Sequence, residues 1–265
     1  MQEVQIQELT YQYPKAAEPT LKGVSFSADA GKVTALIGPN GAGKTTLLKA
    51  AVGILKGSGT VTIHGESIHG RSDEILRREV SYLTQESGLT SDLSVFEVVL
   101  MGKVGSLGLR VSEETLEKVW DTLRILHMEL FAQRPYFALS GGQRKVVSIA
   151  QAIVKDPKVL ILDEPTANLD MQNTLEVMDL VASYTEEMQV TTLVTLHDLN
   201  TASRFADRLV LLKDGRVFSE GTPAQVLTKD SLRLAYGVNA EVSLDQGIPQ
   251  IHPMSSTRKT VFSFR

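Results

Sequence analysis

Four short runs along the chain are continuously apolar and rich in β-branched residues. They cover residues 33–37, 159–162, 191–196 and 209–212. Strands without polar alternation are typical of a parallel sheet that is covered on both faces. Segments with apolar residues at helical spacing lie between the strands, at residues 46–52, 143–154 and 172–183. Because strands alternate with helices, the pattern predicts an α/β fold with crossover helices.

Two regions depart from this alternation. Residues 4–11 and 21–28 alternate polar and apolar positions, which predicts an antiparallel β layer added to the sheet near the N-terminus. From about residue 86 to residue 155 the strand pattern disappears and helical patterns dominate, notably at 95–101 and 113–126. We therefore expect a helical subdomain inserted at about 86–155.

The same reading divides the chain into one domain and a tail. We expect a single domain over residues 1–254, because no linker or internal repeat separates its parts. Residues 255–265 are polar with three basic side chains and are expected to form a loosely held tail. Residues 102–110 are rich in glycine and short of helix formers, so they are expected to be the most flexible part of the helical insertion.

Composition narrows the class of protein. The chain has 265 residues, of which 42% are hydrophobic and 22% charged, so a sizeable core can form. A formal net charge of −4 offers no basic excess, and we expect no nucleic-acid partner. Cysteine is absent, which excludes disulfides and thiol catalysis. No apolar run approaches the roughly 18 residues of a spanning helix and no secretory signal is recognised, so we expect a protein kept inside the cell.

A glycine-rich segment connects the first buried strand to the helical pattern that follows it. Its spelling is Gly-Pro-Asn-Gly-Ala-Gly-Lys-Thr, and a strand before it and a helix after it are the context that a phosphate-binding P-loop requires. Its backbone N–H groups can surround a phosphate, Lys44 supplies a charge between the β- and γ-phosphates, and the Thr45 hydroxyl can ligate Mg²⁺. The expected phosphate-binding residues are Gly38, Pro39, Asn40, Gly41, Ala42, Gly43, Lys44, Thr45 and Thr46.

Two adjacent carboxylates end the apolar strand at 159–162. Successive side chains of a strand point to opposite faces, so Asp163 and Glu164 need different roles. Asp163 is placed to hold Mg²⁺, whereas Glu164 can accept a proton from a water molecule that attacks the γ-phosphate. The alternative interpretation is a turn that merely begins with two solvated acids. The presence of a P-loop in the same chain makes this alternative less favoured.

A third motif, Leu-Ser-Gly-Gly-Gln at residues 139–143, precedes a strongly apolar helix. Its Ser-x-x-Gln spacing fits a capping box, and its small residues at a helix N-terminus can also bind a phosphate. The five residues match the signature sequence of ATP-binding cassette (ABC) proteins. With three motifs in order, the chain resembles the nucleotide-binding subunit of an ABC transporter over roughly residues 4–227. The resemblance implies that Ser140, Gly141, Gly142 and Gln143 contact the nucleotide of a partner chain.

The resemblance also implies the fold and further site residues. The implied fold is that of P-loop NTPases, an α/β fold with a mixed, mainly parallel central sheet, an N-terminal antiparallel β layer and an inserted helical subdomain. Gln85 would touch Mg²⁺, His197 would contact the γ-phosphate, and Tyr13, with Tyr11 as the alternative, would stack on adenine. Asp170 ends the loop after Glu164. Two positions depart from the family pattern: Ala167 stands where serine is commoner, and Lys145 stands where many relatives have glutamine, which we interpret as a surface change.

The implied activity is ATP hydrolysis by a head-to-tail homodimer, with ATP and Mg²⁺ as cofactors, that drives membrane permease subunits from the inner face of the membrane. The spelling at residues 95–103, 197–200 and 220–238 resembles importers of ferric siderophores, haem or cobalamin, which also use a substrate-binding protein. A non-transport ABC ATPase, such as an iron–sulfur assembly factor, remains the alternative, as does import of molybdate or manganese. A P-loop kinase fits less well, because kinases lack the signature.

Overall fold

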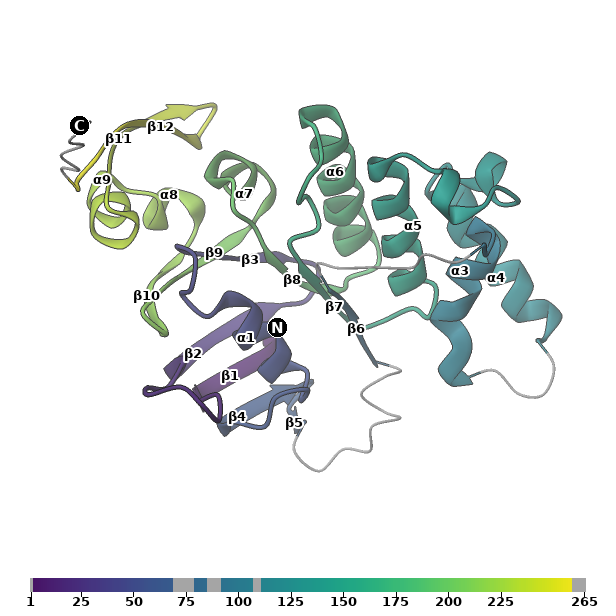
Figure 1. Ribbon diagram of the computed structural model, residues 1–265, viewed down its shortest axis with the longest axis horizontal. Helices are drawn as coiled ribbons and strands as arrows, with labels where there is room; N and C mark the ends of the chain where they lie inside the picture. The colour runs from purple at the N-terminus through teal and green to yellow at the C-terminus, as the bar shows by residue number, and fades with distance from the viewer. Residues whose placement is uncertain (1, 69–78, 85–91, 107–110, 259–265) are drawn as a thin grey trace, which may run out of the picture.

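The computed structural model describes residues 2–68, 79–84, 92–106 and 111–258. A six-stranded sheet crosses the middle of the molecule (Figure 1). Its order is β10 (Arg216–Gly221), β9 (Arg208–Lys213), β3 (Val33–Ile37), β8 (Thr191–Thr195), β7 (Val159–Asp163) and β6 (Val80–Leu83). Neighbouring strands from β9 to β6 run parallel, and β10 pairs antiparallel with β9. The sheet is therefore mixed and mainly parallel, as expected.

Both faces of this sheet are covered, which explains why its strands lack polar alternation. Along β3, Ala35 and Ile37 belong to one buried cluster and Leu36 to the other. The same alternation holds in β7, where Leu160 packs on one side and Ile161 on the other. A strand that is buried on both faces gains apolar contacts at every position, so continuous apolar sequence is favoured.

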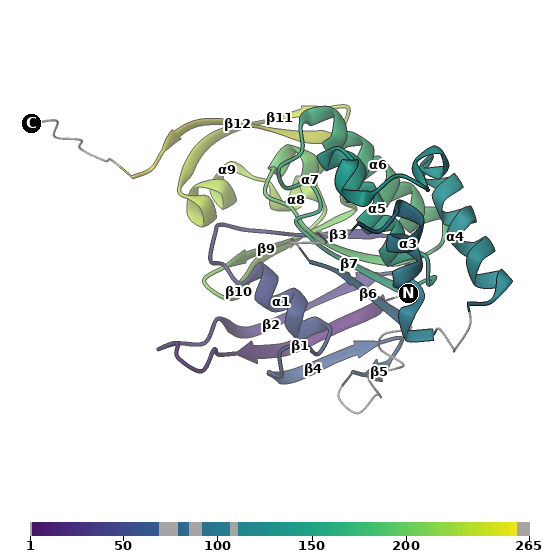
Figure 2. The ribbon, with the colours of Figure 1, turned by 45° about the vertical axis from the view of Figure 1, so that its right-hand side comes forward.

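A second sheet lies below the first in Figure 2 and is entirely antiparallel. Its order is β2 (Leu21–Asp29), β1 (Gln2–Tyr11), β4 (Ser58–Ile63) and β5 (Glu66–Ser67). Helix α1 (Lys44–Ala51) lies between the two sheets, and Leu47 and Leu48 are fully buried there. The expected N-terminal β layer is confirmed, although β4 and β5 were not predicted.

Helices α3 (Val95–Leu100), α4 (Glu113–Ile125) and α5 (Gly141–Ile153) gather at one end of the molecule (Figure 1). Short 3₁₀ helices connect them: η1 (Met101–Ser106), η2 (Glu129–Phe131) and η3 (Tyr136–Ala138). Most of the glycine-rich stretch expected to be flexible is therefore helical. Gly102 packs so closely that an added Cβ would lie 2.2 Å from the Gln151 carbonyl oxygen, and this contact favours an ordered turn. Residues 107–110 lie outside the described part of the chain.

The pattern of apolar and polar residues does not predict most of the elements near the C-terminus. Beyond α6 (Met171–Glu187) and α7 (Leu199–Phe205), the chain forms α8 (Pro223–Val226), α9 (Lys229–Ser231), a π-helical turn η4 (Leu232–Tyr236) and a hairpin of β11 (Val238–Asp245) and β12 (Ile248–Ser256). Asn200 of α7 donates to the Ile251 carbonyl at 3.3 Å and accepts its N–H at 2.8 Å. The strand β12 thus includes the first two residues of the expected tail. Within the described residues, no helix is both long and apolar enough to span a membrane.

Candidate active site

The segment after β3 bends into a loop that only glycines accommodate at three positions. The φ angles of Gly38, Gly41 and Gly43 are +147°, +80° and +103°, which side chains of L-residues disfavour. A Cβ added to Gly38 would also lie 2.3 Å from the Leu212 carbonyl oxygen. The loop borders a cavity of about 640 Å³, lined by Thr20, Asn40, Gly41, Ala42, Gly43, Lys44, Thr45, Thr46, Glu164 and His197.

Lys44 begins α1 and lies almost completely buried at the base of this cavity. Its ammonium donates to the carbonyl oxygens of Gly38 at 2.7 Å and Pro39 at 3.2 Å. Burial lowers the pKa of Lys44, and the carboxylates of Glu164 and Asp163 partly oppose that shift. A buried ammonium whose partners are two neutral carbonyls gains charge compensation when a phosphate enters, which suits Lys44 to phosphate binding.

Asp163 ends β7 and is 2% exposed. Its Oδ1 accepts hydrogen bonds from the hydroxyls of Thr195 at 2.7 Å and Thr45 at 3.2 Å. Mg²⁺ prefers oxygen ligands and is commonly held by one or two carboxylates together with substrate phosphates. The Thr45 hydroxyl and the Asp163 carboxylate form such a set. The described residues contain no group of three or more acidic or histidine side chains that could hold a metal alone.

Glu164 follows directly and lies in the left-handed backbone region, with φ at +51°. Its backbone N–H donates to the Thr195 hydroxyl at 2.8 Å, so Thr195 holds both neighbouring acids. Its side chain lines the P-loop cavity, and Oε1 lies 2.5 Å from Nε2 of His197. With the carboxylate ionised, His197 donates this bond. The two acids therefore occupy different environments, Asp163 among hydroxyls and Glu164 beside an imidazole at the cavity wall.

The expected adenine-stacking residue lies beside the end of the P-loop. The Tyr13 hydroxyl lies 3.3 Å from Oγ1 of Thr46, and the ring, 39% exposed, meets Tyr11 edge to face at a centroid distance of 4.9 Å. An exposed aromatic ring held next to the phosphate loop is available for stacking. Gln85 lies outside the described residues.

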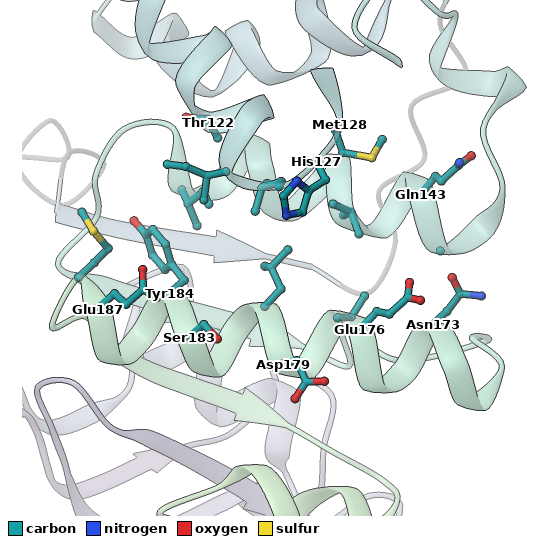
Figure 3. A pocket seen from close by; sticks show the side chains of 18 of the residues that line it. Thr122, His127, Met128, Gln143, Asn173, Glu176, Asp179, Ser183, Tyr184 and Glu187 are labelled. Carbon is teal, nitrogen blue, oxygen red and sulfur yellow. The ribbon is translucent and has the colours of Figure 1, made fainter. Parts of the chain in front are cut away.

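The signature residues do not line this cavity. Ser140 caps α5, with its hydroxyl accepting the Gln143 N–H at 3.2 Å, while the Gln143 side chain accepts the Ser140 N–H at 3.0 Å. The capping box is therefore present, and Ser140 and Gly141 remain exposed at the helix end. Gly142 and Gln143 border a different cavity, between α4, α5 and α6 (Figure 3). Asp170 caps α6 and accepts the Asn173 N–H at 2.8 Å.

Sequence reasoning missed Thr195 and misjudged Lys145. Thr195 looks like any β-branched strand residue, and only the pairing of β7 with β8, which brings it level with Asp163, reveals its contacts. The surface position predicted for Lys145 is wrong, because this side chain is only 9% exposed. Burial lowers the pKa of Lys145, and the negative charge of Glu164 partly opposes the shift. Lys145 is therefore a buried side chain whose pKa depends on the carboxylate of Glu164.

The site combines a P-loop that carries a buried lysine, a pair of acids at a strand end, and a histidine. These features define an NTPase of the P-loop class. A family model described as ABC transporter matches residues 21–167 of the chain. The chain belongs to the ABC transporter family and is an ATPase whose activity is coupled to transport.

Three known proteins illustrate the likeness. The iron(3+)-hydroxamate import ATP-binding protein of Bacillus subtilis is 37% identical over 229 residues, covering 85% of each chain. The phosphonates import ATP-binding protein of Thiobacillus denitrificans is 35% identical over 255 residues, covering 92% of this chain and 98% of that one. A solved ATP-binding cassette, a dimer bound to ADP and phosphate, superposes with a TM-score of 0.73 at 30% identity, covering 83% of this chain and 98% of its own.

Proposed function

We propose that the chain is the ATP-hydrolysing subunit of an importer that takes up an iron chelate, such as a siderophore or haem, or cobalamin through a membrane permease. The observation that carries the proposal is the division of the site. Lys44, Thr45, Glu164 and His197 line one cavity. Of the signature residues of the same chain, none lines that cavity, and Gly142 and Gln143 border another. A single chain therefore supplies an incomplete nucleotide site, and a second copy can complete it.

Closure in a head-to-tail homodimer follows from this division. The exposed N-terminus of α5 offers the Ser140 hydroxyl, the Gly141 backbone N–H and the positive end of a helix dipole to an anion. The γ-phosphate bound by the P-loop of a second chain is such an anion. The cassette solved as a dimer with ADP and phosphate supports this arrangement. ATP binding would bring two chains together, and hydrolysis would separate them.

Within the closed site, we assign proton transfer to Glu164. Its carboxylate lines the cavity and can accept the proton of an attacking water, while the hydrogen bond from His197 fixes the direction of its Oε1. Lys44 neutralises charge on the β- and γ-phosphates. Thr45 and Asp163 would hold Mg²⁺, which supplies further charge compensation to the phosphates, and Tyr13 would carry the adenine.

The cargo rests on the spelling of three segments and on a relative named for iron(3+)-hydroxamate import. A relative named for phosphonates import is similarly close, so phosphonates are the second cargo to consider. The partners that follow are permease subunits at the inner face of the membrane and, indirectly, a substrate-binding protein.

The test is nucleotide-dependent dimerisation followed by reconstitution. Multi-angle light scattering should give the mass of a monomer without nucleotide and of a dimer with Mg²⁺ and a non-hydrolysable ATP analogue. Co-expression with a permease of the iron-chelate importer class should then yield vesicles that take up a ferric siderophore, and not a phosphonate, only when ATP is enclosed. A mass that ignores nucleotide would contradict the shared site. Dimerisation without permease binding or uptake would contradict the proposed import function.

A further inference from the structure

The helix that carries the signature, α5, lies beside α4 and α6. Between α4, α5 and α6 lies a cavity of about 690 Å³, lined largely by apolar side chains such as Leu126, Val146 and Leu180 (Figure 3). Asn173 stands at the N-terminal end of α6, across from Gln143 (Figure 3). Gly142, Gln143 and Asn173 line the cavity at this end, so contacts here help to set where the signature lies relative to α6.

The contact at this end is between Gly142 and Asn173. A Cβ built on Gly142 would lie 1.9 Å from Oδ1 and 2.5 Å from Cγ of Asn173, far closer than real atoms approach. The backbone of Gly142 is helical, so its φ angle does not demand glycine. Glycine fits here because the Asn173 side chain packs against the signature helix of its own chain, and a larger residue would displace that side chain.

The adjacent glycine provides a contrast. A Cβ on Gly141 would meet no atom within 4 Å, so it would project into open space. Alanine at Gly141 would therefore leave this chain undisturbed and affect only what docks against the signature from outside. The two glycines of the signature thus have different reasons to be small.

Asn173 also holds the residue that ends the loop after Glu164. Its side-chain amide donates to Oδ1 of Asp170 at 2.8 Å, and its backbone N–H donates to the same oxygen at 2.8 Å. One side chain thus presents its amide nitrogen to Asp170 and its oxygen to the surface of Gly142. Neither partner can move relative to the other without disturbing Asn173.

We propose that Asn173 is a positioning residue that sets the spacing between the signature and Asp170, so that both reach the nucleotide of a second chain together. The inference rests on the proposed homodimer, because Ser140 and Asp170 act across its interface. Asn173 itself touches no nucleotide. Its role is to act as a stop where the signature helix approaches the N-terminal end of α6.

A double-mutant cycle tests this contact. The variants are Gly142→Ala, Asn173→Ala and the pair, with Gly141→Ala and Gln172→Ala as controls. Gln172 is also exposed in the first turn of α6, but its amide bonds Glu176, 2.8 Å away, and not Asp170. Sedimentation velocity with Mg²⁺ and a non-hydrolysable ATP analogue measures dimer affinity. A fluorescent nucleotide at low protein concentration measures binding to the monomer.

Asn173→Ala should weaken the dimer about 10-fold and leave monomer nucleotide binding within about 2-fold, since the P-loop is untouched. Gly142→Ala should weaken it further. Adding Asn173→Ala should recover at least about 10-fold of that loss, because it removes Oδ1 and Cγ, the two atoms nearest to the new methyl group, and leaves the Asn173 Cβ 3.1 Å away. Gln172→Ala should behave as wild type. Gly141→Ala should fold normally and not be rescued by Asn173→Ala.

If the protein dimerises with the analogue but the effects of Gly142→Ala and Asn173→Ala on dimer affinity simply multiply, the positioning role of Asn173 is wrong. The proposed function would then still stand. If Gly142→Ala does not fold, recovery of folding in the pair supports the contact, and the Asn173→Ala dimer affinity decides the positioning role. A wild-type chain that stays monomeric with the analogue would overturn the proposed function, and this inference with it.

Discussion

Thr195 and Asp163 are joined by a hydrogen bond of 2.7 Å from the threonine hydroxyl to Oδ1, in a part of the sheet where both residues are essentially buried. The same hydroxyl accepts the backbone N–H of Glu164 at 2.8 Å. One strand-end threonine on β8 thus orients the last residue of β7 and the first residue after it. Asp163 and Glu164 are held as a unit before any nucleotide binds.

Thr195→Val should lower the free energy of unfolding by about 1–3 kcal/mol, because Asp163 loses a donor and the Glu164 N–H loses its acceptor in a buried setting. ATP turnover should fall as well, since both acids lose their orientation. Thr195→Ser keeps the hydroxyl and serves as the control. Urea unfolding and steady-state turnover measure the two effects. Equal losses in both variants would show that the methyl group, rather than the hydroxyl, matters.

Lys44→Ala should raise the dissociation constant of ATP at least about 10-fold, because a charged hydrogen-bonding group contributes about 1.5–3 kcal/mol. The fold should survive, since Lys44 bonds only the carbonyl oxygens of its own loop. Isothermal titration calorimetry at fixed Mg²⁺ and salt gives the constant, and Lys49→Ala, on the same helix, is the control. An unchanged constant would remove Lys44 from the phosphate site.

The sequence predicts those parts of the fold in which a local requirement, such as burial on both faces or an unusual backbone angle, determines the residue type at each position. Strand β3 is apolar throughout because both its faces are buried, and the P-loop spells out its own backbone requirements. The strand β4 begins with exposed Ser58 and Gly59, so its pairing with β1 is set by contacts distant in sequence. The hairpin of β11 and β12 is mostly exposed and shows no clear apolar period.

The same distinction separates the site residues. Lys44, Asp163 and Glu164 belong to sequence motifs in which the neighbouring residues are also specified. The motifs therefore predict where these three residues lie in the site. Asn173 and Lys145 have roles that depend on which way a helix faces. Lysine is usually exposed, and nothing in the local sequence indicates that α5 turns Lys145 inward.

Because Lys145 is buried, the free energy of unfolding depends on pH in the alkaline range. Its pKa is lowered in the folded chain, chiefly by burial, so between that value and 10.5 the unfolded chain binds more protons. The free energy of unfolding therefore rises with pH across this window. Lys145→Gln should raise stability at pH 7.5 and reduce the rise measured by urea unfolding as the pH approaches 10.5. Lys49→Gln, partly exposed on α1, is the control. An unaltered pH slope would contradict a cost for charging Lys145.

The sharpest prediction concerns Glu164, whose carboxylate meets His197 at 2.5 Å on the wall of the P-loop cavity. Glu164→Gln keeps the size of the side chain and removes the proton acceptor. Nucleotide affinity should persist, because Lys44 and the loop backbone are unchanged, while turnover should fall by roughly 10²- to 10⁴-fold. ATP, no longer hydrolysed, should then hold two chains as a stable dimer in light scattering.

Asp163→Asn and His197→Ala separate this role from its neighbours. Asp163→Asn should weaken Mg²⁺-dependent nucleotide binding, because the carboxylate that accepts from Thr45 loses its charge. His197→Ala should slow turnover less than Glu164→Gln, since the base remains and loses only its orienting donor. Turnover at the wild-type rate in Glu164→Gln, with saturating ATP and contaminating ATPases excluded by a parallel Lys44→Ala preparation, would refute the assignment. The proton acceptor would then have to be His197, whose exposed ring lines the same cavity.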